Sequence, residues 1–421
     1  MRTFHATERS LNVEYAIRDV LIPARKLEEK GAKIIKLHIG DPNKWDFETP
    51  KHVRDALGRA VEINDNGYAE SEGYPELRAA ILKKEKQKNG VDVGIDNCMI
   101  TSGVTEAIQS LVAATISPGD EALVPGPGYP SYTEFIKFFN GKPVSYHNDE
   151  ENDWQPDIDD MRKKITDKTK FITVINPNKI APAATIAPAT PNGWSGSTPN
   201  NPTGALYSDK VLKQIVDLAG EYDLFVLSDE IYDLMSFEGT HHSPASMTKD
   251  VPVVLFNGFS KVDLLPGWRM GYMVFSDPLN CMDEIKEGIS KQLRLRISAN
   301  NPCQMAAIEA LEGPQDHHEQ INRKLKERAQ YMYKRVNNIP GLSMRAPKGA
   351  FYAFPRIDSK HWTNDMDFVL DILDNCHVLL VPGSGFDEKY GKMHFRAVFL
   401  PPLDTLGEAF DSIESYMNKV A

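Results

Sequence analysis

The sequence predicts an α/β fold, in which a mostly parallel sheet carries helices on both faces and a smaller α+β unit is attached to it. The first observation is that segments with helical spacing alternate with short β-branched runs, the pattern of parallel strands joined by helices. The second is the length of 421 residues, enough for one large domain and a smaller one. The third is a change of pattern after about residue 304, where a charged helical stretch leads into short strands.

The N-terminal segment is expected to join the smaller unit. Residues 13–30 have apolar side chains at helical spacing, and this pattern ends at Gly31. Residues 34–39 form a short strand candidate that leads into Gly40. We expect residues 12–40 to pack with the C-terminal part of the chain.

The middle of the chain supplies the strands of the predicted sheet. Each strand candidate is a short run rich in apolar and β-branched residues, separated from the next by a helical pattern. Ligands of parallel sheets bind beyond the carboxyl ends of the strands, and the polar motifs described below follow these runs directly. The candidates are residues 98–101, 121–124, 171–175, 224–227 and 253–256.

The C-terminal part predicts the smaller unit. Residues 304–335 are helical and charged, and we interpret them as a bridge between the two units. The expected division is residues 1–50 as an N-terminal arm and part of the small domain, 51–310 as the large domain, and 311–421 as the C-terminal small domain. Within the last of these, the sequence predicts strands at 350–355, 378–381 and 394–399, a helix at 366–375, and a final helix through Met417.

Residues 179–200 interrupt this organisation. They are rich in Pro, Ala, Ser and Gly and have neither strand nor helix periodicity, so we interpret them as a loop or a partly disordered insertion. Deleting them would join Asn178 to Asn201 in an unbroken I-N-P-N-N-P-T-G motif. One hypothesis is a solvent loop that leaves Asn201 in place, because lengthening a loop costs little entropy. The alternatives are that the segment is absent from the mature functional protein or that it impairs the protein.

Charge and cysteine content exclude several classes of protein. The net charge of −11 argues against binding to nucleic acid or to an anionic membrane surface. No stretch approaches the roughly 20 apolar residues of a membrane helix, and the start of the chain has no apolar signal segment. Four scattered cysteines, without a C-x-x-C pair or a histidine at ligand spacing, argue against zinc and against a disulfide framework. We therefore expect a cytoplasmic protein without a metal site.

A lysine motif follows the last strand candidate of the sheet. The stretch from Gly258 to Gly271 reads GFSKVDLLPGWRMG, with Lys261 directly after Ser260 and Arg269 eight residues further on. A lone lysine is normally a solvated surface residue, but this whole pattern resembles the cofactor-attachment signature of class I aminotransferases. The resemblance implies the fold type I architecture of transferases that use pyridoxal 5′-phosphate. It also implies that Lys261 is the catalytic residue and bonds covalently to the cofactor aldehyde, for which its pKa must be lowered.

Three more motifs, interpreted with this resemblance, imply contacts with the pyridine ring. Asp229, after the strand candidate at 224–227, would face the ring nitrogen and keep it protonated. Tyr232 and Asn201, the latter in N-P-T-G, would hydrogen-bond the 3′ oxygen, and Tyr129 in P-G-P-G-Y-P would stack on the ring. Considered alone, Asp229 could be a loop residue, Asn201 part of an ordinary turn, and Tyr129 a core side chain.

A phosphate seat is predicted where the strand candidate at 98–101 gives way to a helix. The backbone N–H groups of Gly103, Val104 and Thr105 would lie at the helix N-terminus, where they attract an anion together with the Thr105 hydroxyl. The resemblance implies that Arg269 also contacts the phosphate, since a planar guanidinium suits an oxyanion.

Two further phosphate contacts depend on the resemblance alone. Tyr68 corresponds to a tyrosine that reaches the phosphate across a dimer interface, which implies a homodimer with shared active sites. Many relatives carry a serine at the position of Gly258, and we expect Ser260 to take over its contact.

The substrate contacts implied by the resemblance lie near the two ends of the chain. Arg396, in H-F-R-A-V, corresponds to the arginine that holds the substrate α-carboxylate through a bidentate pair. Gly40 corresponds to the glycine whose backbone lies against the same carboxylate, and Asn201 would also contact the substrate. Arg296 has the spacing of a residue that binds a second, distal carboxylate, although an ion pair with a glutamate is equally consistent with the sequence.

The resemblance extends over nearly the whole chain and is closest to alanine aminotransferases of the archaeal and bacterial type. It implies ping-pong transamination from L-alanine to 2-oxoglutarate, giving pyruvate and L-glutamate, with amino acids and 2-oxo acids as the only partners besides the second subunit. One alternative is a broad aspartate or aromatic aminotransferase, which shares every cofactor contact. Others are a fold homologue impaired by residues 179–200 or a PLP-sensing regulator, although the acidic chain has no room for a DNA-binding domain.

Overall fold

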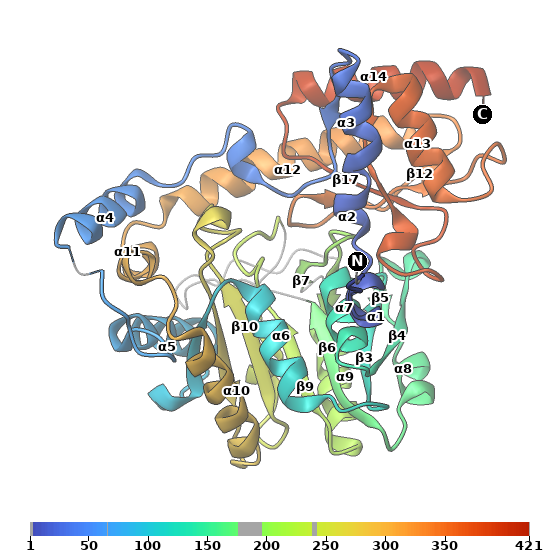
Figure 1. The fold of residues 1–421 in the computed structure, drawn as a ribbon. Helices are drawn as coiled ribbons and strands as arrows, with labels where there is room; N and C mark the ends of the chain where they lie inside the picture. Colours follow the sequence, from blue (N-terminus) through green and yellow to red (C-terminus); the bar gives the residue numbers. More distant parts are fainter. Residues whose placement is uncertain (1–2, 65, 176–195, 238–241, 421) are drawn as a thin grey trace, which may run out of the picture.

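A computed structural model describes residues 3–64, 66–175, 196–237 and 242–420, with backbone only for 196–199. An eight-stranded sheet in the order β2-β11-β10-β9-β6-β3-β4-β5 forms its centre (Figure 1). All of its strands run parallel except β11 and β5, which pair antiparallel with their neighbours. In this order the strands are Cys98–Thr101, Gly271–Ser276, Val253–Gly258, Phe225–Asp229, Thr169–Ile175, Glu121–Gly126, Lys142–Asp149 and Gln155–Pro156.

Helices cover both faces of this sheet, as expected for strands that are apolar on both sides. In β6, Phe171 and Ile175 pack into one apolar core with α6, α7 and α10, whereas Ile172 and Val174 pack into the opposite core with α5, α8, α9 and α11. On the first face lie α6 (Val104–Thr115), α7 (Pro130–Phe138) and α10 (Asp283–Arg296). On the second lie α5 (Pro75–Asn89), α8 (Ile158–Lys164), α9 (Asp209–Glu221) and α11 (Asn301–Glu312) with α4 (Lys51–Glu62) packed against it.

The smaller unit combines the two ends of the chain, with residues 20–37 packed against the C-terminal part as expected, whereas Glu14 and Tyr15 contact Glu134 and Tyr129 of the other unit. Strand β1 (Ile35–Lys36) pairs parallel with β15 (Val378–Leu379), and Val20, Ala24 and Leu37 share one apolar core with the C-terminal helices. A three-stranded sheet in the order β13-β17-β16 lies in the same unit. Its strands are Tyr352–Ala353, Phe395–Val398 and Val381–Pro382, and its helices are α12 (Asp316–Asn337), α13 (Asp365–Cys376) and α14 (Leu403–Val420).

Two stretches with helical periodicity turn out to be broken helices. Residues 13–30 contain α2 (Ala16–Asp19) and α3 (Leu21–Glu29), because Pro23 has no N–H to continue the hydrogen bonds of a single helix. Residues 304–335 fall into α11 and α12, which are separated at Gly313 and Pro314 for the same reason. Both breaks turn the chain where the periodicity alone predicts a straight element.

The segment at 179–200, interpreted as a loop or insertion, lies almost entirely outside the described residues. Its last part differs from the expectation, because the backbone of β7 (Gly196–Pro199) pairs antiparallel with β8 (Leu206–Ser208). Among the described residues, no helix is both long enough and apolar enough to cross a membrane.

Candidate active site

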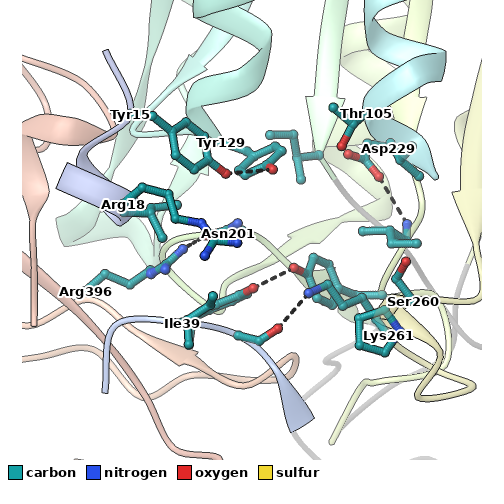
Figure 2. Close-up of a pocket in the computed structure, with 18 of the residues that line it drawn as sticks. Tyr15, Arg18, Ile39, Thr105, Tyr129, Asn201, Asp229, Ser260, Lys261 and Arg396 are labelled. Carbon is teal, nitrogen blue, oxygen red and sulfur yellow. Dashed lines mark hydrogen bonds between the residues drawn. The ribbon is translucent and has the colours of Figure 1, made fainter. Parts of the chain in front are cut away.

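A pocket opens between the carboxyl ends of the parallel strands and the smaller unit. Figure 2 shows that α2, the strand ends and β17 all contribute side chains to it. Three of the predicted residues are not among those that line it: Gly103, Tyr68 and Arg296. The predicted residues that line the pocket are Gly40, Val104, Thr105, Tyr129, Asn201, Asp229, Tyr232, Ser260, Lys261, Arg269 and Arg396.

Lys261 brings a partly buried amine into the pocket. It follows β10 by three residues, and its Nζ donates a hydrogen bond of 2.9 Å to the carbonyl oxygen of Gly40. Burial, followed by the positive charge of Arg396, lowers the pKa of Lys261 from 10.5 to about 8. A useful fraction of this amine is therefore neutral, and hence nucleophilic, near neutral pH.

Asp229 is a buried carboxyl group at the end of β9. Its Oδ2 accepts a hydrogen bond of 2.7 Å from the Tyr132 hydroxyl, and its Oδ1 accepts one of 3.2 Å from the backbone N–H of Ile231. Burial raises the pKa of Asp229 to about 6, although both hydrogen bonds and the nearby Lys261 favour the ionised form. A cationic group placed beside Asp229 would therefore be bound strongly.

Arg396 is a buried cation on the central strand of the three-stranded sheet. Its Nη1 donates to Asn201 Oδ1 at 2.9 Å, and its Nη2 donates to the His38 carbonyl at 2.6 Å. The guanidinium lies over the rings of Tyr352 and Phe386, at 4.6 and 4.8 Å. Because no carboxylate is among these contacts, Arg396 can still receive an anion from the pocket.

The backbone at Gly40 lies too close to its neighbours for any side chain. A Cβ at this position would lie 2.5 Å from Phe351 Cε2 and 2.5 Å from the Tyr352 hydroxyl. Glycine therefore lets the loop after β1 approach Lys261, so that the Gly40 carbonyl can accept the hydrogen bond from the amine.

The start of α6 provides a second place for an anion. Gly103 is the N-cap of this helix, with φ of +74°, and it supplies no side chain to cap the first N–H groups. A Cβ on Gly103 would lie 2.4 Å from Arg269 Nη2, so glycine leaves room for this guanidinium at the helix start. Glu106 holds the turn by accepting from the Ser102 N–H at 2.6 Å. Free N–H groups, the helix dipole and a guanidinium together favour a phosphate.

Two tyrosine pairs line the remaining wall. The hydroxyl groups of Tyr15 and Tyr129 are 2.9 Å apart, and those of Tyr232 and Tyr352 are also 2.9 Å apart. Burial raises the pKa of Tyr232 well above its usual value of 10, so this hydroxyl stays protonated and can donate.

The backbone around Gly258 leaves no room for a side chain. It pairs with Gly271 of β11, and a Cβ on Gly258 would lie 2.7 Å from the Met270 carbonyl oxygen. Ser260 does line the pocket, so its hydroxyl is available for the contact assigned to it.

Tyr68 and Arg296 do not line the pocket. Tyr68 is 83% exposed and lies outside the pocket of its own chain. Arg296 donates to Glu106 at 2.6 Å and to the Ser71 carbonyl at 2.7 Å. It is not among the residues that line the pocket, so the ion pair with glutamate, rather than the distal carboxylate, accounts for Arg296.

Sequence reasoning missed the part of the pocket that comes from the N-terminal segment. Tyr15, Ile17 and Arg18 line it, although their stretch was interpreted only as a packing helix. Tyr352 and Tyr132 were missed as well, the latter although it lies inside the P-G-P-G-Y-P-S-Y motif. Arg18 lines the pocket together with Arg396 and adds a second guanidinium to it (Figure 2).

Comparisons with known proteins agree on one family. Residues 32–189 and 197–413 match the sequence profile described as aminotransferase class I and II. The glutamate-pyruvate aminotransferase of Escherichia coli K12 is 37% identical over 94% of this chain and 93% of its own. The alanine aminotransferase of Mycobacterium bovis is 34% identical over 99% and 93%. A solved structure of an alanine aminotransferase from Pyrococcus furiosus covers 99% of this chain and 100% of its own, with 53% identity and a TM-score of 0.92.

Proposed function

Because the chain belongs to the class I and II aminotransferases, we propose that it transfers the amino group of L-alanine to 2-oxoglutarate with pyridoxal 5′-phosphate as its cofactor. The products would be pyruvate and L-glutamate. The choice of substrates is supported by the names of the full-length relatives, which are 34–53% identical to this chain.

The pocket fits this cofactor on three independent counts. The uncapped start of α6 with Gly103, Thr105 and Arg269 suits a phosphate. The buried carboxyl of Asp229 suits a protonated ring nitrogen. The lowered pKa of Lys261 suits bonding of its amine to an aldehyde. These features lie on three separate strand ends and converge on one pocket.

The remaining cofactor contacts follow from the same pocket. Bound pyridoxal phosphate supplies an aldehyde and an electron-withdrawing ring. We propose that Tyr232 and Asn201 donate to the 3′ oxygen of the ring, that Tyr129 packs against the ring, and that Ser260 contributes to the phosphate seat. Tyr132, which donates to Asp229, would keep that carboxyl oriented toward the pocket.

Lys261 also has the properties of a base. In its neutral form, Nζ could accept the proton from the substrate α-carbon and deliver it to the C4′ carbon of bound pyridoxal phosphate within the same half of the cycle. Its position beside the Gly40 carbonyl and opposite Arg396 would keep this nitrogen near a carboxylate-bound amino acid.

In this proposal two arginines bind the two carboxylates of the dicarboxylic substrates. Arg396 would form a bidentate pair with the α-carboxylate, held in place by Asn201 and the His38 carbonyl. Gly40, which also lines the pocket, would lie with its backbone against that carboxylate. Arg18 would reach the distal carboxylate of glutamate and 2-oxoglutarate, because Arg296 is already paired with Glu106. With alanine, Arg18 would remain in solvent.

The proposal depends above all on one observation, the Lys261 amine of lowered pKa between an anion seat and a buried acid. Its test is pyruvate formation by the purified full-length chain with L-alanine, 2-oxoglutarate and pyridoxal phosphate. We expect pyruvate only when 2-oxoglutarate is present, and a loss of at least about 10⁴-fold in Lys261→Ala.

Substituting L-aspartate or an aromatic amino acid for L-alanine separates the alternatives. If one of these donors gives the higher kcat/KM, alanine is the wrong substrate although the reaction class is right. If no donor yields a 2-oxo acid, the proposed activity is wrong altogether.

A further inference from the structure

A cluster of imidazole and carboxylate groups lies outside the active-site pocket. Asp263 follows Lys261 by two residues and is buried, while His317 and His318 begin the long helix α12 and are mostly shielded. Among the described residues, these three form the one group of His, Cys, Asp or Glu side chains whose ligand atoms all lie within 4.8 Å of one another. The cluster joins segments that are far apart in the sequence.

The distances within the cluster do not fit hydrogen bonds. His317 Nε2 is 3.8 Å and His318 Nε2 is 3.6 Å from Asp263 Oδ1, whereas an N–H···O bond spans about 2.7–3.2 Å. Around a tetrahedral zinc ion, with bonds of about 2.0–2.2 Å, two ligand atoms lie about 3.3–3.6 Å apart. The separation of 3.6 Å falls at the upper end of this range and that of 3.8 Å slightly beyond it, so a small shift of the side chains would let all three contact one ion.

Three of the four imidazole nitrogens of His317 and His318 lack a hydrogen-bond partner among the described residues. Within the described part of the chain, both ring nitrogens of His317 and Nε2 of His318 are buried and form no hydrogen bond. Burying polar atoms without partners is costly, so their presence calls for a ligand. His52 of α4 adds a similar atom, because its Nε2 is buried and unpartnered and its ring centroid is 6.2 Å from that of His317.

Asp263 has the charge that a cation requires. It supplies the one carboxylate of the cluster and is buried. A carboxylate in such a region of low dielectric attracts a divalent cation strongly.

We propose that Asp263, His317 and His318 bind a divalent transition-metal ion of the zinc type, with the fourth position taken by water or His52. Two imidazoles and one carboxylate are the ligands that zinc accepts and that magnesium does not prefer. The bound ion would hold the segment after Lys261 against the start of α12. This site serves structure and not the transfer reaction, so it stands whether or not alanine is the substrate.

The test uses full-length protein stripped of metal with a chelator and then dialysed against Zn²⁺ or Mg²⁺. We expect the wild type to retain about one more equivalent of zinc than the double variant His317→Gln/His318→Gln. Zinc should also raise the melting temperature of the wild type by roughly a few degrees, but not that of the double variant. Magnesium should have no such effect.

His361→Gln is the matched control, because this histidine is exposed and distant from the cluster in the sequence. The control should bind zinc and respond to it like the wild type. Diffraction at the zinc absorption edge from zinc-soaked wild-type crystals gives an answer even if the double variant fails to fold. A zinc peak between Asp263 and the two histidines supports the site. Equal zinc retention by wild type and double variant, or peaks only elsewhere, would overturn it.

Discussion

Burial and two neighbouring groups determine whether the amine of Lys261 is protonated and where it points. Removal from water disfavours the ammonium form of Lys261, and the guanidinium of Arg396 disfavours it further. The Gly40 carbonyl accepts from the same nitrogen and keeps it directed into the pocket. The protein thus maintains a reactive lysine by placing it where its charge is unfavourable, and this must reduce the stability of the cofactor-free protein.

Replacing Lys261 by methionine should stabilise the cofactor-free protein at neutral pH. A pKa lowered from 10.5 to about 8 corresponds to about 3 kcal/mol, which is an upper value because the side chain is only partly buried. Below pH 8 the lysine is protonated in both the folded and the unfolded wild type, and the folded protein is destabilised by this full amount. As the pH rises from 8 toward 10.5, the folded protein has lost the proton while the unfolded chain still holds it, so the destabilisation disappears. Denaturant titrations of both proteins at pH 7 and pH 10 measure the difference. A difference in unfolding free energy between the two proteins that is larger at pH 10 than at pH 7 would contradict the lowered pKa.

Arg18→Gln should change KM for the two amino-acid substrates of the proposed cycle to different extents. Loss of a charge-assisted pair with the distal carboxylate should raise KM for 2-oxoglutarate and L-glutamate about tenfold. KM for L-alanine should change by less than about threefold, because alanine has no second carboxylate. Arg345→Gln is the control, since Arg345 pairs with Glu151 at the surface. Equal effects on alanine and glutamate would remove Arg18 from this role.

The elements of the sheet could be predicted well from the sequence, and the turns of the N-terminal segment could not. A strand buried on both faces, such as Thr169–Ile175, leaves a continuous apolar run that few other structures produce. The break between α2 and α3 depends on one proline and on contacts with the distant C-terminal unit. Local periodicity does not report such long-range contacts.

The same contrast holds for the candidate site. Lys261 and Asp229 lie in motifs with fixed spacing, and the structure brings both to the pocket. Tyr15 and Tyr352 reach it from segments whose local patterns carry no such signal. The zinc ligands escaped notice because Asp263 and the adjacent histidines at 317 and 318 are far apart in the chain. Only folding makes them neighbours.

Gly40→Ala should disturb the loop that follows β1. The new Cβ would collide with Phe351 and Tyr352, and overpacking of this kind costs roughly 1–3 kcal/mol. We expect a lower melting temperature and a loss of roughly 10- to 100-fold in kcat/KM, because the loop moves away from Lys261. Gly58→Ala is the matched control in the interior of α4, where a Cβ meets nothing within 4 Å. It should stabilise the protein by up to about 1 kcal/mol.

Deleting residues 179–200 tests whether this segment impairs turnover. The contacts of Asn201 with Arg396 are formed in the presence of the segment. If the segment is a harmless loop, turnover of the deletion variant should stay within about threefold of the full chain, because loop length alone costs little. A large gain in turnover on deletion would instead favour impairment by the segment. Intact mass of the protein from its natural source tells whether the segment is retained.

The predicted contact of Tyr68 with the cofactor phosphate is not made within a single chain. Tyr68 is largely exposed and does not line the pocket of its own chain. Exposed apolar side chains occur in the same region of the chain, at Val61 and Ile63. We propose that a second copy covers this surface and that Tyr68 contributes to the phosphate seat of the partner, which makes each site depend on two subunits.

Mixing two damaged subunits should restore activity if sites are shared in this way. In a heterodimer of Lys261→Ala and Tyr68→Ala chains, one site combines both defects and the other has neither. At limiting pyridoxal phosphate, where loss of the Tyr68 contact weakens retention of the cofactor, we expect the isolated heterodimer to reach about half of the wild-type activity and to exceed both parent proteins. Differently tagged chains, co-expressed and purified through both tags, provide the sample. If Tyr68 acted within its own chain, each site of the heterodimer would carry one defect, and activity would not rise above the mean of the parents. A monomeric wild-type protein in sedimentation analysis would rule out sharing directly, and Tyr68 would then have to be explained as an ordinary surface residue.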